Sequence, residues 1–264
     1  MISDADVARY EEDGAICLRG AVPGEWIERL RAGIDAAIAN PGPMKRITSK
    51  LGEPISFLDS QLWQRHDDCR AFIFESPAPA LAAQLMKSRE VVLYHDRLQV
   101  REAGAAERTF WHHDQPYYPI DGRQVVSFWL PLDALSRELC IEYVCGSHRW
   151  GRWFQPTLAH RGEAQVDDPR FEPMPDIEAE RGRHEFLAWD VEPGDVVAYH
   201  ALTLHGATRG ATSQHRRRTW EIRWCGDDVR YAQRVGPISP RLDGHGLVPG
   251  DPLRCAMFPK VWPR

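Results

Sequence analysis

Two adjacent histidines and an aspartate in the stretch TFWHHDQPYY, residues 109–118, have the types and spacing of metal ligands. The aromatic residues and the proline that follows predict a strand that runs into a turn. Because side chains alternate between the two faces of a strand, His112 and Asp114 share one face and His113 points to the other. Taken alone, such a pair is more often a structural hydrogen bond than a metal site. The downstream sequence must therefore decide whether a third ligand exists.

That third ligand is expected in the stretch PGDVVAYHALTLHGA, which contains His200 and His205 near the far end of a predicted strand. A polar, glycine-containing loop leads from it to a second predicted strand, HRRRTWEIRW. A strand that ends in histidine beside a strand that begins with arginine would place a cation close to the metal. The residues alone leave open which histidine binds the metal and which arginine faces it.

Composition limits the classes of protein to which this chain can belong. The apolar and charged fractions, 43% and 27%, are typical of a globular protein and exclude disorder and coiled coil. No apolar run is long enough to span a bilayer, and the net charge of -5 argues against general nucleic-acid binding. The six cysteines form no CxxC pair, which favours reduced thiols and a cytoplasmic location over a disulfide framework.

The elements that must position these residues change character along the chain. Helices are expected before residue 90: one after the N-cap Ser3 and ending at Gly14, an amphipathic one in residues 22–40, and a pair broken at Pro77. Residues 41–60, rich in Pro, Gly and Ser, are expected to be irregular. From residue 90 onward strands dominate. This order predicts an α+β protein in which helices cover a sheet or barrel. The expected strands are VVLYHDRLQVR, QVVSFWLPLD, CIEYVCGSH, DVVAYH and RTWEIRW.

The chain is expected to form a single domain over residues 1–264, with a helical flank in 1–89 and a mainly β core in 90–264. Residues 150–183 have few strand signals and many Arg, Pro and charged residues. A loop of that length inside a compact domain is usually functional. We therefore expect a lid-like insertion there, with a disordered insertion as the alternative.

Several of these motifs, taken in order, resemble the landmarks of the phytanoyl-CoA dioxygenase-like family. They are FWHHDQPYYP, SFWLPLD, EYVCGSHRWG, PGDVVAYHALTLHGA and RRRTWEIRW. The first residues, including DGAICLRGAVPGEWIERLR, and the stretch YHDRLQVREAG also look like that family, so the resemblance covers nearly the whole chain. It implies a double-stranded β-helix, the jelly roll also found in cupins, flanked by N-terminal helices. It also implies iron(II) as cofactor, 2-oxoglutarate as cosubstrate and O2 as oxidant.

By the family motif, the iron ligands are His112, Asp114 and His205. Two histidines and one carboxylate on one face of an octahedron leave positions open for the keto acid and O2. The retained Asp114 speaks against the related halogenases, in which a small residue opens that position for chloride. His200 is then expected to be a core histidine or one that supports the site. The resemblance further suggests that Gln99 and Trp129, on inward-facing strands, line the cosubstrate pocket.

An arginine should bind the distal carboxylate of 2-oxoglutarate, because a guanidinium fork matches a carboxylate. In the family this arginine stands seven residues before an aromatic, here Trp224, so the resemblance indicates Arg217, whereas counting forward from His205 with the commonest loop length indicates Arg216. The apolar residues at 220, 222 and 224 alternate along this strand, and Arg218 lies on the same face as they do. If that apolar face packs on helices, Arg217 points into the barrel, and we therefore expect Arg217 to hold the carboxylate.

The predicted function is hydroxylation of a small organic metabolite, with release of succinate and CO2. Three alternatives stay open: another iron-based oxidation such as desaturation, cyclisation or demethylation; a non-catalytic protein that binds a metal or metabolite; and a cupin-like enzyme that does not use 2-oxoglutarate. Charged residues on the expected inward faces favour a polar or anionic substrate. They are Arg97, Arg101, Glu221 and Arg223. No nucleic-acid or membrane partner is indicated, and the oligomeric state is not readable.

Overall fold

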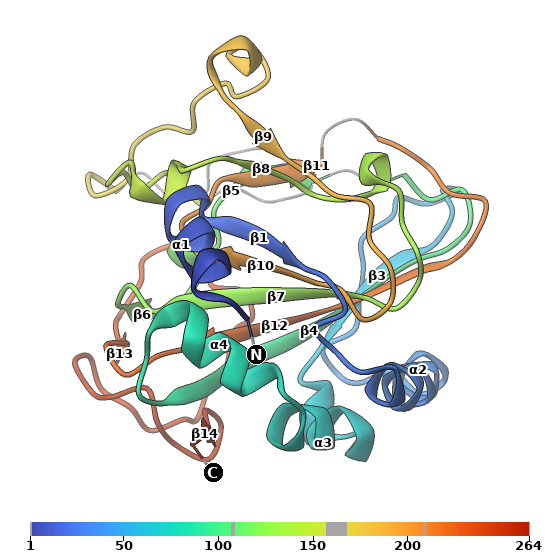
Figure 1. The fold of residues 1–264 in the computed structure, drawn as a ribbon, viewed down its shortest axis with the longest axis horizontal. Helices are drawn as coiled ribbons and strands as arrows, with labels where there is room; N and C mark the ends of the chain where they lie inside the picture. Colours follow the sequence, from blue (N-terminus) through green and yellow to red (C-terminus); the bar gives the residue numbers. More distant parts are fainter. Residues whose placement is uncertain (1, 107–108, 157–167, 208–209, 264) are drawn as a thin grey trace.

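Two antiparallel β-sheets lie one over the other, and helices cover the outer face of the larger sheet (Figure 1). The computed structural model describes residues 2–106, 109–156, 168–207 and 210–263. The larger sheet has eight strands, and β14 (Lys260–Trp262) pairs with β4 beside the main path. Along that path the order is β1 (Ala15–Leu18), β10 (Val196–His200), β7 (Val125–Pro131), β12 (Arg217–Cys225), β4 (Val91–Arg101), β3 (Ser56–Ser60) and β2 (Arg46–Ile47).

The smaller sheet carries the first of the sequence motifs on its edge strand. Its order is β5 (Thr109–His112), β11 (His205–Ala207), β8 (Glu142–Val144) and β9 (Phe186–Leu187). A separate pair joins β6 (Ile120–Asp121) to β13 (Arg230–Tyr231). Short 3-10 helices occupy several connections: η1 (Leu62–Gln64), η2 (Gln115–Tyr117), η3 (Arg137–Leu139), η4 (Ser147–Arg149) and η5 (Arg181–Arg183).

The described residues form four α-helices, which lie where the sequence predicts them. They are α1 (Asp4–Asp13), α2 (Gly24–Ala39), α3 (Asp67–Glu75) and α4 (Ala78–Met86). Ser3 caps α1 in a capping box, and Gly14 ends it in the left-handed conformation at φ 79°. The pair α3 and α4 breaks at Pro77. No helix in the described ranges has both the length and the apolar character needed to cross a bilayer.

The main apolar core lies between the helices and the outer face of the larger sheet. Trp220, Ile222 and Trp224 of β12 are fully buried in it, and the Trp220 ring packs edge-on against Phe72 of α3 at 5.5 Å. The alternate residues of β12 therefore face the space between the two sheets. This confirms the predicted parity of the strand and directs Arg217 inward.

Residues 41–60 were expected to be irregular, and that prediction is wrong for β2 and β3, although 41–45 and 48–55 form no helix or strand. Thr48 to Pro54 form the turn of a hairpin whose arms are β2 and β3, and β3 pairs with β4. The Pro, Gly and Ser residues between the two strands indicate a loop, and the strands are too short to show a periodic pattern. Consequently β1, β2 and β3 all join strands from beyond residue 90 in one sheet.

In the predicted lid at 150–183, the described residues form the isolated bridge between Phe154 and Glu172 and the short helix η5. The part of this segment at 157–167 lies outside the described residues. Its role as a lid therefore stays a prediction, as does the division of the domain at residue 90.

Candidate metal centre and adjoining cavity

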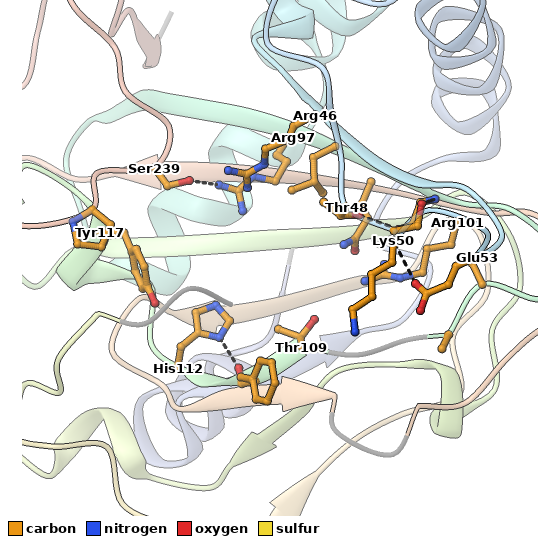
Figure 2. Close-up of a pocket in the computed structure, with 18 of the residues that line it drawn as sticks. Arg46, Thr48, Lys50, Glu53, Arg97, Arg101, Thr109, His112, Tyr117 and Ser239 are labelled. Carbon is orange, nitrogen blue, oxygen red and sulfur yellow. Dashed lines mark hydrogen bonds between the residues drawn. The ribbon is translucent and has the colours of Figure 1, made fainter. Parts of the chain in front are cut away.

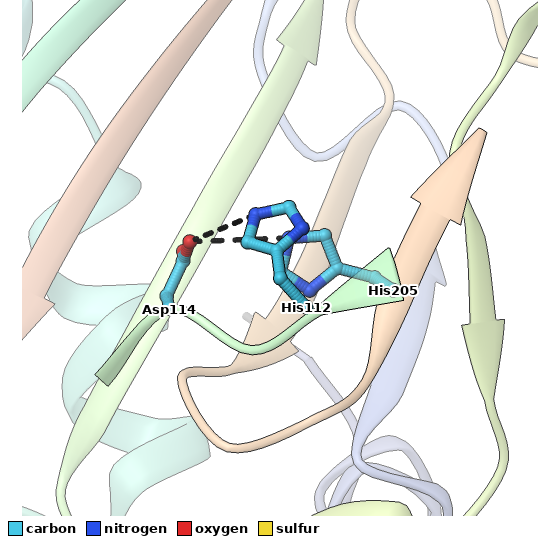
Figure 3. A group of neighbouring side chains, drawn as sticks. All are labelled: His112, Asp114 and His205. Atoms are coloured by element: carbon cyan, nitrogen blue, oxygen red, sulfur yellow. Dashed lines mark ion pairs between the residues drawn. The ribbon is translucent and has the colours of Figure 1, made fainter. Parts of the chain in front are cut away.

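His112, Asp114 and His205 converge between the two sheets (Figure 3). His112 ends β5, His205 begins β11, and the two residues are direct cross-strand partners. Their ring centroids are therefore only 4.3 Å apart. The chain turns after β5 and brings the Oδ1 atom of Asp114 within 3.7 Å of His112 Nε2 and 3.9 Å of His205 Nε2. One donor atom from each side chain lies within 4.8 Å of the other two.

The hydrogen bonds of both imidazoles direct the Nε2 atoms toward this common point. His112 Nδ1 lies 2.9 Å from the carbonyl oxygen of Phe110, and His205 Nδ1 lies 2.9 Å from that of Thr203. A carbonyl can only accept, so each Nδ1–H donates, and Nε2 is the nitrogen left to bind a metal. Burial, followed by the neighbouring His205, lowers the pKa of His112 to about 3, which keeps its imidazole neutral. Two imidazoles and one carboxylate on one side fit a divalent metal.

The second oxygen of Asp114 is held by groups of the larger sheet. Its Oδ2 atom lies 3.3 Å from both Ser127 Oγ and Tyr199 Oη, which donate to it, and 3.7 Å from the Arg223 guanidinium. Arg223 also pairs with Glu221 at 2.6 Å. Burial would raise the pKa of Asp114, but the positive charge of Arg223 holds that pKa below its ordinary value. Asp114 is therefore ionised and fixed in orientation before any metal arrives.

His113 and His200 lie outside this cluster. The His113 ring packs on Phe154, and its Nε2 accepts the backbone N–H of that residue at 2.9 Å. His200 Nδ1 accepts the N–H of Leu202 at 3.0 Å, and its Nε2–H donates to the carbonyl of Arg123 at 2.8 Å. Both nitrogens of His200 are thus engaged by the backbone. Of the two candidates for the third ligand, His200 and His205, it is His205 that lies beside His112 and Asp114.

A cavity of about 590 Å³ opens beside His112 and Asp114 (Figure 2). Gln99 of β4 lines it, as the sequence suggested. Trp129 of β7 is instead buried in an apolar cluster with Tyr143 and Tyr199, and it is not among the lining residues. The indole N–H of Trp129 and the hydroxyl of Thr219 have no hydrogen-bond partner among the described residues. Both groups are buried on inward-facing strands, so they can hydrogen-bond a ligand held between the sheets.

The three consecutive arginines have different surroundings. Arg216 is exposed and pairs with Glu102, whereas Arg218 pairs with Asp133 and Asp35 on the outer side. Arg217 is only 4% exposed, and its guanidinium donates to the carbonyl of Ala105 at 2.7 Å. Arg217 is not itself among the cavity-lining residues, but Ala105 is, as is Arg101, the cross-strand partner of Arg217.

Sequence reasoning missed several residues around the site. The hydroxyl donors to Asp114, Ser127 and Tyr199, lie on predicted strands, but the alignment between strands was not readable. Arg46 and Lys50 line the cavity from the hairpin that was expected to be irregular. Ser239 reaches the cavity from the C-terminal segment, where we predicted no element.

Comparison with known proteins agrees with this architecture. The family model described as phytanoyl-CoA dioxygenase matches residues 10–219. The multifunctional dioxygenase prhA of Penicillium brasilianum is 21% identical over 247 residues, which cover 82% of this chain and 70% of that protein.

Two solved structures share the fold over nearly their whole length. One is the non-heme alpha ketoglutarate dependent carbocyclase SnoK from nogalamycin biosynthesis, at 24% identity and a TM-score of 0.77, covering 98% of this chain and 96% of that one. The other is the epimerase SnoN in complex with Fe3+, alpha ketoglutarate and nogalamycin RO, at 19% identity and a TM-score of 0.79, covering 98% of both chains. The predicted mainly β jelly roll is therefore confirmed.

Proposed function

Because the chain belongs to the phytanoyl-CoA dioxygenase family, whose model covers residues 10–219, we propose that it is an iron(II)- and 2-oxoglutarate-dependent dioxygenase that hydroxylates a small organic molecule. The observation that carries this proposal is the convergence of two Nε2 atoms and one carboxylate oxygen, from His112, His205 and Asp114, beside a cavity. This is the donor set of non-haem iron oxygenases. SnoN, which shares the fold, was crystallised with Fe3+ and alpha ketoglutarate.

In the proposed mechanism His112, Asp114 and His205 would hold the iron, and the chemistry supplied there would be oxidation by O2 with conversion of 2-oxoglutarate to succinate and CO2. The backbone carbonyls of Phe110 and Thr203 fix the tautomers of the two imidazoles. Hydrogen bonds from the larger sheet fix the Asp114 carboxylate, so the ligands need little rearrangement when the metal binds.

Arg217 is proposed to bind the distal carboxylate of 2-oxoglutarate. Its guanidinium is already oriented by Ala105, and burial strengthens a charged hydrogen bond there. Gln99, Thr219 and Trp129 would contact the same cosubstrate through their polar groups. These roles rest on the inward position of the four side chains and on the Thr219 and Trp129 donors, which have no hydrogen-bond partner in the described part of the chain.

Hydroxylation is the proposed outcome among several that one iron centre supports. The names carbocyclase and epimerase on two proteins of the same fold mark cyclisation and epimerisation as competing outcomes. Mass spectrometry of the product separates them, since hydroxylation adds one oxygen atom, cyclisation or desaturation removes two hydrogens, and epimerisation leaves the mass unchanged. A cytoplasmic location is part of the same proposal.

The proposal is tested by anaerobic addition of Fe(II) and then 2-oxoglutarate to metal-free protein. A charge-transfer band in the visible spectrum is expected, because the keto acid chelates iron through two oxygens. His205→Ala should lose the band, whereas His200→Ala should keep it. Iron binding without a band would remove the cosubstrate and favour a cupin-like enzyme, and iron binding with a band but no succinate under O2 would favour a non-catalytic protein.

A further inference from the structure

Arg46, Lys50 and Arg97 line the cavity along with Arg101, the cross-strand partner of Arg217, and we call the first three the cationic wall. Arg97 projects from β4, Arg46 from β2, and Lys50 from the turn between β2 and β3. Figure 2 shows the two arginines next to each other and the Lys50 side chain directed into the cavity. None of the three belongs to the proposed iron or 2-oxoglutarate set.

Among the residues that the structure describes, no carboxylate forms an ion pair with Arg46, Lys50 or Arg97, although the charge of Arg97 also acts on Asp114. Arg97 donates to Ser239 Oγ at 3.3 Å, a neutral partner. The carboxylate of Glu53 accepts the backbone N–H of Lys50 at 3.0 Å, not its amino group. By contrast, Arg218 on the outer face pairs with two carboxylates. The cations of the wall are therefore available for a ligand.

The two arginines also act on each other. Partial burial, followed by the charge of Arg97, lowers the pKa of Arg46, so the positive charge of Arg46 is disfavoured beside Arg97. A bound anion would remove this repulsion and gain two charge-assisted hydrogen bonds. The Ser239 hydroxyl, beside Arg97, could donate a third.

Apolar side chains complete the cavity. Leu58, Phe110, Pro237 and Ile238 line it together with the cationic wall, and the same cavity extends to the ligand His112. A molecule with one charged end and a carbon body matches this division, because the body would pack on the apolar lining while the charge stays at the arginines. The carbon body would then face the metal position.

We propose that the substrate is an organic acid or phosphate ester whose oxyanion binds the cationic wall at Arg46 and Arg97. This inference rests on the proposed function for the reaction, but anion binding at the wall can be measured independently. Carboxylate and phosphate share the chemistry that the guanidinium groups recognise, so the test includes both.

The test uses full-length protein loaded with Fe(II) and 2-oxoglutarate under anaerobic conditions. Calorimetry measures the binding of 2-naphthoate, 2-naphthyl phosphate and the neutral 2-naphthamide, while the charge-transfer band is recorded to show that 2-oxoglutarate stays bound. The variants are Arg46→Gln, Arg97→Gln and their combination. Arg89→Gln is the matched control, since its side chain is 92% exposed and pairs with Asp227 away from the cavity.

We expect at least one anion to bind the unmodified protein about 10- to 100-fold more tightly than the amide, the range of charged hydrogen bonds. Arg97→Gln and Arg46→Gln should each reduce this preference, and the double variant should abolish it with the band unchanged. The anion that binds more tightly identifies carboxylate or phosphate as the natural group.

Two results would overturn the inference. One is an anion preference that is absent, or that survives in the double variant. The other is loss of the charge-transfer band in Arg97→Gln, which would mean that this arginine holds 2-oxoglutarate. Failure of the proposed function looks different, because the band would then be missing from the unmodified protein while calorimetry still reports on the cationic wall.

Discussion

Replacement of Arg217 by glutamine tests the assignment of the cosubstrate site. The glutamine keeps a similar length but loses the positive charge and the guanidinium fork. Arg217 is 4% exposed, and its guanidinium donates to the Ala105 carbonyl, so the side chain is held in the interior beside a residue that lines the cavity. Loss of a buried charge-assisted contact costs about 3 kcal/mol, which corresponds to a Kd for 2-oxoglutarate that rises on the order of 100-fold.

Two further variants test whether cosubstrate binding depends on the positive charge, on the guanidinium fork or on the position of the arginine. Arg217→Lys keeps the charge without the fork, and we expect an intermediate loss of about 10-fold. Arg216→Gln removes an exposed ion pair with Glu102, and such a pair contributes at most about 1 kcal/mol to stability, so cosubstrate binding should not change.

The assay is an anaerobic titration of the Fe(II)-loaded variants with 2-oxoglutarate, followed by the charge-transfer band, with iron affinity measured separately. Thermal unfolding controls for the hydrogen bond to Ala105, whose loss should cost about 1 kcal/mol. The reasoning fails if Arg216→Gln weakens the cosubstrate more than Arg217→Gln does, or if Arg217→Gln binds 2-oxoglutarate as the unmodified protein does.

Three other predictions concern the metal, a turn and a buried acid. His205→Ala should lower iron affinity at least about 100-fold in equilibrium dialysis, and equal loss in His200→Ala would contradict the ligand assignment. Gly14 and Gly20 both have positive φ, but a Cβ at Gly14 would lie 2.2 Å from His148 Nδ1 and one at Gly20 would meet nothing within 4 Å. Gly14→Ala should therefore be destabilised by about 2 kcal/mol more than Gly20→Ala in urea unfolding, and equal losses would refute the steric argument. Burial raises the pKa of Asp96 from 3.8 to about 6, so the folded state binds a proton that the unfolded chain has lost, and this group's contribution to stability is present below pH 4 and lost as the pH rises through 6. The stability of the unmodified protein relative to Asp96→Asn should fall by about 3 kcal/mol over that range, and a difference that does not vary with pH would exclude the raised pKa.

The sequence predicted the parts of the site that depend on local periodicity. The alternation of side chains predicted that His112 and Asp114 lie on one side and His113 on the other. The structure has this arrangement, although β5 ends at His112 and Asp114 belongs to the following turn. Parity also directed Arg217 inward, because the outward residues of β12 are the apolar ones that the helices cover.

What could not be predicted depends on contacts between distant segments. Arg46 and Lys50 reach the cavity because β2 pairs with β3 and β3 pairs with β4. A strand of two residues carries no periodic signal, so nothing in residues 41–60 indicated this pairing. The contact between Tyr199 and Asp114 could not be predicted for a similar reason. The distance between the two side chains depends on how the two sheets face each other, and not on the sequence of either strand alone.

The hairpin of β2 and β3 gives the protein a separate route for changing substrate preference. The proposed iron ligands and Arg217 lie on or beside β5, β11 and β12, in the space between the two sheets, where substitution would disturb the core or the metal. Arg46 and Lys50 lie on the edge hairpin, and both are exposed. Sequence change in residues 46–54 could therefore select new acids, or neutral molecules, while the oxygen chemistry is inherited unchanged. A library confined to this hairpin is the natural starting point for engineering the enzyme.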